Sequence, residues 1–229
     1  MSNYLIASHK PWNSSLVDDM KLVFPKDNWF FINNKEDFNL DNIKNIAPEY
    51  IFIPHWSYII KEEIYKSYNC IVFHMTDLPF GRGGSPLQNL ISKGFCETKI
   101  SAIVVEKQID AGPVYLKMNL SLLGPAEEIF IRANKLIGEM ITKIINERIK
   151  PEPQIGTSTI FKRRTPEMSE ITNELKEVDY LHDHIRMLDA EGYPKAFLET
   201  KFFKFEFTRA ALKSDGTIIS DVKITKNRK

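Results

Sequence analysis

The chain has 229 residues, 43% of them hydrophobic, so it can bury a full core and should form one main domain with a modest extension. Its 31 lysines and arginines balance 30 aspartates and glutamates, which argues against a nucleic-acid partner or an anionic membrane surface. No apolar run approaches the ~20 residues of a membrane span, and the start of the chain lacks a basic leader, so we expect a cytoplasmic protein without a membrane partner.

Metal sites and disulfides are not expected. The two cysteines, Cys70 and Cys96, lie in no C-x-x-C motif or histidine-rich cluster. The triplet His182-Asp183-His184 resembles a metal-binding motif, but residues two apart on a helix point in different directions and would not converge on one ion.

The first 150 residues alternate short apolar runs with helical patterns, which predicts an α/β fold: a Rossmann-like, mostly parallel sheet with crossover helices. The strands are expected at Tyr4 to Ala7, Trp29 to Ile32, Tyr50 to Pro54, Cys70 to His74 and Ser101 to Glu106. A first helix should begin at Ser14 or Ser15, with Ser15 and Asp18 spaced for a capping box, and another near Ser57.

Two further helices follow. A short one is predicted from Ser85 as N-cap, through Pro86 at the first helical position, to Gly94 just past its end. A long one is predicted from about Ala126 to Arg148, where apolar residues form one stripe at helical spacing. The long helix is expected to serve as scaffold.

The residue composition changes after Lys150, so we divide the chain into a catalytic domain, 1–150, and a C-terminal extension, 151–229. The extension should hold a helix from roughly Val178 to Ala190. It should also hold a β-hairpin in which Phe203, Phe205 and Phe207 share one face. That apolar face could cover the main core or form an interface in a homodimer.

His74 and Asp110 are the best candidates for chemistry. His74 ends an apolar run and precedes Gly81-Arg82-Gly83-Gly84-Ser85, a loop that a ligand could approach closely. A histidine held by a carboxylate can move protons during acyl transfer to an amine. Taken separately, each feature has a structural reading: a hydrogen-bonded histidine at a strand end, a turn aspartate and a flexible glycine turn.

Three stretches carry a family resemblance. They are Phe73-His74-Met75-Thr76-Asp77-Leu78-Pro79-Phe80-Gly81-Arg82-Gly83-Gly84-Ser85-Pro86-Leu87-Gln88, Glu97-Thr98-Lys99-Ile100-Ser101-Ala102 and Ile109-Asp110-Ala111-Gly112-Pro113. In this order they resemble the His-x-Ser-Leu-Leu-Pro…Gly…Pro-Ile-Gln, Glu-Thr-Gly-Val-Thr and Leu-Asp-Thr-Gly-Asp segments of the folate-dependent formyltransferases. That group contains methionyl-tRNA, glycinamide ribonucleotide and nucleotide-sugar formyltransferases. The match covers roughly residues 50 to 145.

The resemblance implies transfer of a formyl group from the co-substrate 10-formyltetrahydrofolate to a primary amine. His74 would move the proton, and Asp110 would orient it, stabilise its charged form or help accept the amine proton. Folate contacts would come from Pro54, His55, Trp56, Ser57, Ile109, Ala111 and Gly112, and acceptor contacts from Arg82, Gly83, Gly84 and Ser85. Trp56 and Tyr58 could equally be packing residues.

One position departs from the family pattern. The family has an asparagine two residues before the histidine, where it orients the formyl oxygen, but this chain has Val72, which cannot donate a hydrogen bond. Either protonated His74 and backbone N–H groups stabilise the oxyanion, or a nearby side chain does; His55, Ser57 and Thr76 are the candidates.

The acceptor is expected to be a nucleotide-activated amino sugar. Arg163-Arg164-Thr165-Pro166-Glu167 and the stretch from Ile185 to Phe197 resemble the segment after the catalytic domain in nucleotide-sugar formyltransferases, and the chain ends too soon for a large tRNA-binding domain. Glycinamide ribonucleotide or a methionyl-tRNA-type acceptor is the alternative, although residues 7–13 lack a glycine-rich phosphate loop. Hydrolysis of the donor by water, or a binding module without turnover, also stays open.

Overall fold

The computed structural model describes residues 1–227, which form two compact units. Unit 1 consists of Met1–Gly83, Thr98–Leu120 and Ile131–Ile160, and unit 2 of Gly84–Glu97, Ser121–Phe130 and Phe161–Lys229, whose last two residues lie outside the described part. The chain thus passes between the units several times. A division into 1–150 and 151–229 stays a prediction about domain organisation.

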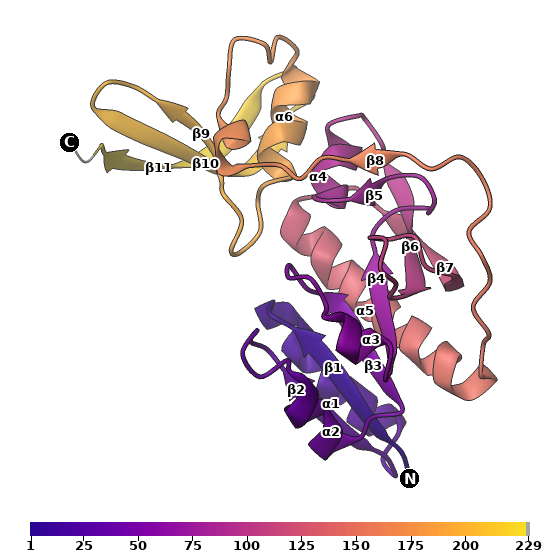
Figure 1. Ribbon diagram of the computed structural model, residues 1–229. Coiled ribbons are helices and arrows are strands. Elements are labelled where there is room, and N and C mark those ends of the chain that lie inside the picture. Colours follow the sequence, from indigo (N-terminus) through magenta and orange to yellow (C-terminus); the bar gives the residue numbers. More distant parts are fainter. Residues whose placement is uncertain (228–229) are drawn as a thin grey trace. The chain divides into compact units, whose positions relative to one another are not determined.

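Unit 1 is built on a six-stranded sheet in the order β2-β1-β3-β4-β6-β7 (Figure 1). Its strands are β1 (Asn3–Ser8), β2 (Asn28–Ile32), β3 (Tyr50–His55), β4 (Asn69–His74), β6 (Glu97–Val104) and β7 (Val114–Ser121). β2, β1, β3 and β4 are parallel, whereas β6 pairs antiparallel with β4. This confirms the predicted α/β, Rossmann-like, mostly parallel fold.

The central strands are apolar along their length because both faces of the sheet are covered, which is typical of parallel strands. Leu5, Ile6 and Phe52 are fully buried. One face carries a core cluster to which β1, β3 and β4 contribute alternate residues, while α2 (Leu40–Ile46) and α3 (Glu62–Tyr65) contribute Ile43 and Ile64. β6 begins earlier than expected and ends at Val104, and β7 was not predicted, since its apolar residues alternate with Lys117 and Asn119.

The remaining helices of unit 1 are α1 (Ser14–Val23) and most of α5 (Ala126–Glu147), which pack closely where Gly138 faces Leu16 and Met20. α5 has the bounds that its apolar stripe predicted. The prediction of a capping box at the start of α1 was wrong, because Ser15 lies inside the helix and its hydroxyl donates to the Trp12 carbonyl (3.3 Å). The prediction of a helix near Ser57 was also wrong. After β3 the chain has no regular structure until α3, and Trp56 and Ile60 of this segment pack against the core cluster.

Unit 2 contains α4 (Pro86–Ile91), α6 (Val178–Arg186) and a three-stranded sheet in the order β11-β10-β9. The short elements are η1 (Pro11–Asn13) in unit 1, η2 (Pro166–Ser169) in unit 2, and the pair β5 (Arg82–Gly83) and β8 (Ile160–Phe161). Ser85 precedes α4 as expected, but in a left-handed conformation, and its hydroxyl accepts from the Arg164 N–H instead of capping the helix. α6 ends at Arg186 and not at Ala190, and the Asp189 carboxylate that follows accepts from the Arg209 N–H (2.7 Å).

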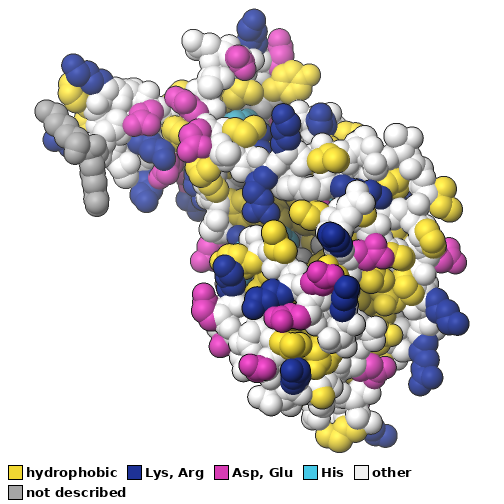
Figure 2. Space-filling model, in the orientation of Figure 1, with side chains coloured by type: hydrophobic (Ala, Val, Ile, Leu, Met, Phe, Trp, Pro, Cys, Tyr) yellow, Lys and Arg dark blue, Asp and Glu magenta, His cyan; other side chains and the backbone are white. Residues whose placement is uncertain are grey.

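The expected hairpin is present as β10 (Phe203–Leu212) and β11 (Ile218–Lys226), and β9 (Ala196–Glu199) adds a strand that was not predicted. Phe205 pairs with Ile224 and Phe207 with Val222, so the apolar residues share one face, and several of them remain exposed. Basic and acidic side chains are interspersed over the face drawn in Figure 2. Within residues 1–227, every helix is too short or too polar to cross a bilayer.

Candidate active site

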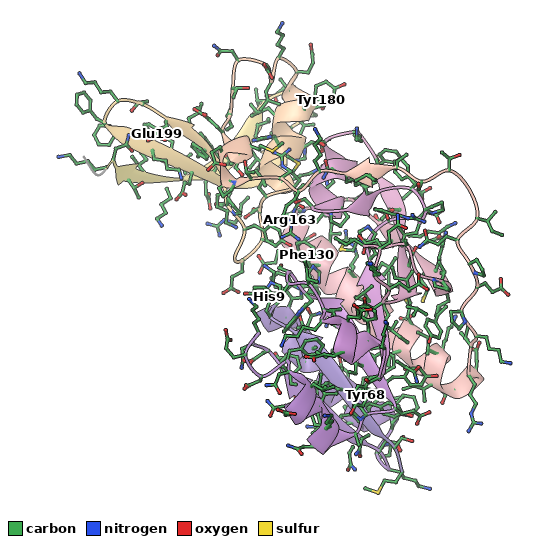
Figure 3. The ribbon with its side chains drawn as sticks, in the orientation of Figure 1. His9, Tyr68, Phe130, Arg163, Tyr180 and Glu199 are labelled. Atoms are coloured by element: carbon green, nitrogen blue, oxygen red, sulfur yellow. The ribbon has the colours of Figure 1, made fainter. Side chains whose placement is uncertain are left out.

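The carboxyl ends of β1 and β3 mark the topological switch point of unit 1. From β1 the chain goes first to β2 on one side and then to β3 on the other. In open α/β sheets, ligands bind outside the carboxyl ends of the strands at such a point. His9 and His55 lie there, joined by a hydrogen bond from the His9 N–H to the His55 carbonyl (3.4 Å). Figure 3 shows His9 at this edge and Tyr68, which precedes β4, at the opposite edge.

Buried polar contacts fix the loop that follows β1. The Ser8 hydroxyl donates to Asn13 Oδ1 (2.8 Å), and Asn13 Nδ2 donates to Asn134 Oδ1 on α5 (2.5 Å). All three side chains are buried, so their hydrogen bonds are retained away from competing water. These contacts tie both ends of the loop that carries His9 to unit 1.

Aromatic rings gather around His9. The His9 ring lies 6.2 Å from the ring of Trp56 and 6.1 Å from that of Tyr58, and its Nε2 is 3.3 Å from the Ser57 hydroxyl. Trp56 also packs on Phe38 (4.9 Å) and the core cluster, so one side of its ring serves packing. Of the residues expected to contact folate, Pro54 is buried within β3, whereas Ser57 and Tyr58 are exposed.

His55 is partly buried, and its Nδ1 is shielded from solvent. Burial lowers the pKa of His55 to about 3, and the positive charge of Lys10 acts in the same direction. Burial also lowers the pKa of His9, again with Lys10 contributing. His55 is therefore a neutral imidazole at neutral pH, which can donate one hydrogen bond and accept another.

His74 ends β4 and is 8% exposed. Its Nε2 lies 2.8 Å from the Gly81 carbonyl, and its Nδ1 lies 3.5 Å from Asp110 Oδ2. Because a carbonyl can only accept, the proton of the neutral ring must sit on Nε2. Nδ1 is then the basic atom, and it faces the Asp110 carboxylate.

Asp110 sits in a constrained loop. Its φ of 53° is left-handed, a conformation in which aspartate is among the better tolerated residues. Its Oδ2 accepts from the Gly83 N–H (2.9 Å), so the carboxylate ties the glycine loop to His74. The loop also passes close to β6: a Cβ on Gly112 would lie 2.0 Å from the Val104 carbonyl oxygen, which only glycine avoids. Ile109 is 66% exposed at the edge of this loop, and Ala111 is partly buried.

The segment after α5 holds the glycine loop. Thr159 accepts through Oγ1 from the Gly81 N–H (2.7 Å) and through its carbonyl from the Arg82 N–H (2.9 Å). Gln154 Oε1 accepts from Arg82 Nε (3.2 Å) and from a terminal nitrogen of the same guanidinium (2.7 Å). Part of the Arg82 side chain is therefore engaged within unit 1.

Two lysines hold the loop between His74 and Gly81. Asp77 pairs with Lys117 (2.5 Å) and Lys99 (2.9 Å), and Lys117 also donates to the Leu78 carbonyl. Partial burial would raise the pKa of Asp77, but the hydrogen bonds from the two lysines outweigh it and hold that pKa below its usual range. Asp77 therefore stays ionised and anchors the loop.

The candidate oxyanion donors differ in availability. The Thr76 hydroxyl is buried and lies 3.4 Å from the Gly81 carbonyl, so it braces the loop. The Ser57 hydroxyl contacts His9. Val72 packs against the core cluster, as Ile53 does, its partner on β3. His74 follows Val72 by two residues in β4 and lies on the same face, whereas the register of β3 shifts before His55, whose ring lies 5.9 Å from the ring of Trp12.

Gly84 and Ser85, expected to contact the acceptor, belong to unit 2. There Gly84 approaches Arg163 so closely that a Cβ would lie 2.6 Å from the Arg163 Cβ, which a larger residue could not tolerate.

The contacts of the His182-Asp183-His184 triplet on α6 are accounted for without a metal. His184 Nε2 lies 3.1 Å from the Ser169 carbonyl, and Asp183 pairs with Arg186 (2.6 Å).

Sequence reasoning did not single out Gln154, Thr159, Lys117 or His9. Gln154 and Thr159 lie in a segment that was taken only as the exit from the sheet domain. Lys117 is one of many lysines, and His9 lies in a loop without a recognisable motif. Only the folded chain brings these four residues to the carboxyl edge.

Comparison with known proteins gives the family. A methionyl-tRNA formyltransferase from Clostridium thermocellum of solved structure is 48% identical, with 99% of this chain and 100% of that chain covered and a TM-score of 0.95. The chain belongs to the folate-dependent formyltransferase family. The profile described as "Methionyl-tRNA formyltransferase, C-terminal domain" matches residues 166–225 of this family member.

More distant formyltransferases are also similar to this chain. A methionyl-tRNA formyltransferase from Wolbachia pipientis subsp. Culex pipiens is 26% identical over 199 residues, which cover 82% of this chain and 64% of that protein. A structure from Mycobacterium tuberculosis, described as a likely sugar N-formyltransferase, covers all of both chains at 12% identity with a TM-score of 0.69, which shows a shared fold. The matched part of the chain covers less than two thirds of the length of curated methionyl-tRNA formyltransferases that are similar to it in sequence.

The lowered pKa of His55 predicts acid sensitivity of the fold. Between about pH 6.5 and pH 3 the unfolded chain binds a proton at His55 that the folded chain does not, so the stability present above pH 6.5 is lost as the pH falls through this window. On going from about pH 7 to about pH 5, wild type should lose about 1–2 kcal/mol more unfolding free energy than His55→Gln, with partial exposure keeping the value modest. Urea unfolding of both proteins at both pH values measures this. An equal acid loss in the two proteins would show that His55 is not the source.

Proposed function

We propose that this protein transfers a formyl group from 10-formyltetrahydrofolate to a primary amine. The observation that carries the proposal is the pairing of His74 Nδ1 with Asp110 Oδ2, 3.5 Å apart and mostly buried, beside a glycine loop at the carboxyl edge of the sheet. Membership of the formyltransferase family supports the donor. The aromatic and imidazole side chains after β1 and β3 supply flat surfaces suited to a pterin ring.

The reaction requires one proton to be moved. The amine nitrogen forms a bond to the formyl carbon, and the carbonyl electron pair moves to oxygen, giving a tetrahedral intermediate with a positively charged nitrogen. That nitrogen loses a proton, the oxyanion re-forms the carbonyl, the bond to folate N10 breaks, and N10 takes up a proton. His74 Nδ1, the basic atom of the ring, is the group that we assign to this transfer.

Asp110 orients the imidazole through Nδ1 and stabilises the imidazolium that forms during the transfer. A carboxylate 3.5 Å away favours the charged ring, and little water competes because His74 is buried. The hydrogen bond from the Gly83 N–H holds the carboxylate in place. The Gly81 carbonyl holds the other ring nitrogen, so the imidazole is oriented from both sides.

We assign the oxyanion contact to His55, because position 72 is a valine. His55 ends β3 and His74 ends the adjacent strand β4, so both imidazoles lie at the carboxyl edge of the sheet. As a neutral imidazole it can donate a hydrogen bond without adding a positive charge that would oppose protonation of His74. Ser57 is the second candidate, through its exposed hydroxyl.

The acceptor that we propose is the amine of a methionyl-tRNA-type substrate. The support is the identity to the Clostridium thermocellum methionyl-tRNA formyltransferase over the whole chain, together with the profile match at residues 166–225. The expectation of a nucleotide-activated amino sugar, and the argument against a nucleic-acid partner, have weaker support than this alternative. The sugar stays a second candidate, because the balance of 31 basic and 30 acidic residues provides no net field for a polyanion.

The acceptor can be identified directly. Wild-type protein is mixed with 10-formyltetrahydrofolate and, in turn, methionyl-tRNA, nucleotide-activated amino sugars and glycinamide ribonucleotide. Release of tetrahydrofolate is followed by absorbance and the formyl mass increment by mass spectrometry. We expect release that depends on methionyl-tRNA. Release with an amino sugar alone would identify the second candidate, release without any amine would indicate hydrolysis, and binding without release would leave only a binding module.

Removing either member of the proposed pair should slow turnover by at least ~100-fold, the usual scale for a proton-transfer group. His74→Ala removes the base, and Asp110→Asn removes the charge while keeping a side chain that tolerates the left-handed backbone. Asp41→Asn, an exposed carboxylate on α2, is the matched control and should keep the wild-type rate. Steady-state kcat decides the matter, and near-wild-type values in both pair variants would exclude these roles.

The oxyanion assignment predicts unequal effects at two neighbouring residues. His55→Ala should lower kcat by about 100-fold, the scale for loss of one oxyanion donor, whereas Ser57→Ala should leave kcat within about threefold of wild type. Both variants should keep donor affinity well enough to be saturated. Unaltered turnover in both would reject a contribution from this loop, and a loss confined to Ser57→Ala would move the role to the hydroxyl.

A further inference from the structure

Gln154 links two loops of the site that are far apart in sequence. It lies in the segment that follows α5, and its side-chain amide uses both ends. Gln154 Nε2 donates to the carbonyls of Asp110 and Gly112, each at 2.9 Å. Gln154 Oε1 accepts from two nitrogens of the Arg82 guanidinium.

The backbone on each side anchors this amide. Glu152 pairs with Val114 through two backbone hydrogen bonds of 2.7 and 2.9 Å, and Thr159 is hydrogen-bonded to Gly81 and Arg82. Gln154 lies between these anchors and is partly buried, while most residues from 152 to 160 are exposed. Its side chain is thus placed by the strand pairing before it and the loop contacts after it.

The Asp110 loop needs such a restraint. Asp110 has a left-handed backbone, which costs on the order of 1 kcal/mol for a residue other than glycine and persists only when neighbouring contacts hold it. The two carbonyls that Gln154 binds are that of Asp110 itself and that of Gly112, two residues further along the chain. With them fixed, Asp110 Oδ2 stays within reach of both the Gly83 N–H and His74 Nδ1.

We propose that Gln154 is a positioning residue for catalysis: it clamps the Asp110 loop to Arg82 and so fixes the distance between the Asp110 carboxylate and His74. This inference rests on the proposed function, in which Asp110 acts through His74. Gln154 contacts Asp110 only through the backbone carbonyl and makes no contact with the Asp110 carboxylate or the His74 ring, so its loss should act on the reaction by altering the geometry of the pair.

The test uses two substitutions that affect the two sets of Gln154 hydrogen bonds differently. Gln154→Leu keeps a side chain of similar size but removes the hydrogen bonds to Arg82 and those to the Asp110 loop. Gln154→Glu keeps an acceptor for Arg82 but places a carboxylate against the Asp110 and Gly112 carbonyls. Both should lower kcat by about 10-fold or more and raise KM for donor and acceptor by a smaller factor, because a small misplacement of catalytic groups affects chemistry more than binding. Gln108→Leu, an exposed glutamine beside the same loop, is the matched control and should keep the wild-type kcat.

A kcat equal to wild type in both variants would overturn the proposal. A wild-type kcat in Gln154→Glu alone would also overturn it, since the hydrogen bonds to Arg82 would then be sufficient without those to the Asp110 loop. A rise in KM without a fall in kcat would assign Gln154 to substrate binding.

A second measurement does not depend on activity. Exchange of the Gly83 amide hydrogen reports the hydrogen bond to Asp110 Oδ2. It should be at least about 10-fold faster in Gln154→Leu than in wild type and in Gln108→Leu, while the urea concentration at the midpoint of unfolding stays close to that of wild type. Unchanged exchange would refute the clamp even if turnover fell. If wild type releases no tetrahydrofolate with any amine, the proposed function fails, and the exchange measurement still decides whether Gln154 positions the loop.

Discussion

The site depends on a carboxylate and an imidazole held at 3.5 Å where little water reaches them. In bulk water such a pair would gain little, because solvent screens its attraction. Here each partner has a second tether: His74 to the Gly81 carbonyl and Asp110 to the Gly83 N–H. The glycine loop between them is therefore part of the pair, and the lysines on Asp77 and the buried Thr76 hydroxyl brace the turn that leads into it.

The sheet supplies the frame for this arrangement. Parallel strands bring their carboxyl ends to one edge, so β1, β3 and β4 deliver His9, His55 and His74 to the same side of unit 1. These histidines have different environments. His9 and His55 are kept neutral by burial and by Lys10, whereas His74 faces an acid. One residue type can thus supply both a proton acceptor and neutral hydrogen-bond donors along one edge.

Much of this could be read from the sequence, and the remainder follows tertiary contacts. The central strands and α5 were predictable because burial on both faces, or along one stripe, leaves an apolar pattern. The edge strand β7 is only partly buried and alternates apolar with polar residues, and β9 has only four residues, so neither has the long apolar run of the central strands. The starts of α1 and α4 were predicted correctly, but the expected serine caps do not form, because the hydroxyls of Ser15 and Ser85 bind other partners. Motif order brought His74 and Asp110 into one hypothesis, but a glutamine and a threonine in a polar segment give no sign of what they will touch.

The route of the chain has a consequence for how this edge is completed. Three stretches meet there, 74–83, 109–113 and 154–159, and the last arrives only after the 22 residues of α5. Closing so long a loop costs conformational entropy, and the secondary-structure propensity of the segment does not offset this cost. The last stretch should therefore become ordered late, after the sheet and α5 have packed. A polypeptide cut at residue 150 would keep the imidazole and the carboxylate but lack the segment that joins their loops. Ribosomal synthesis must therefore pass residue 159 before the edge can be complete.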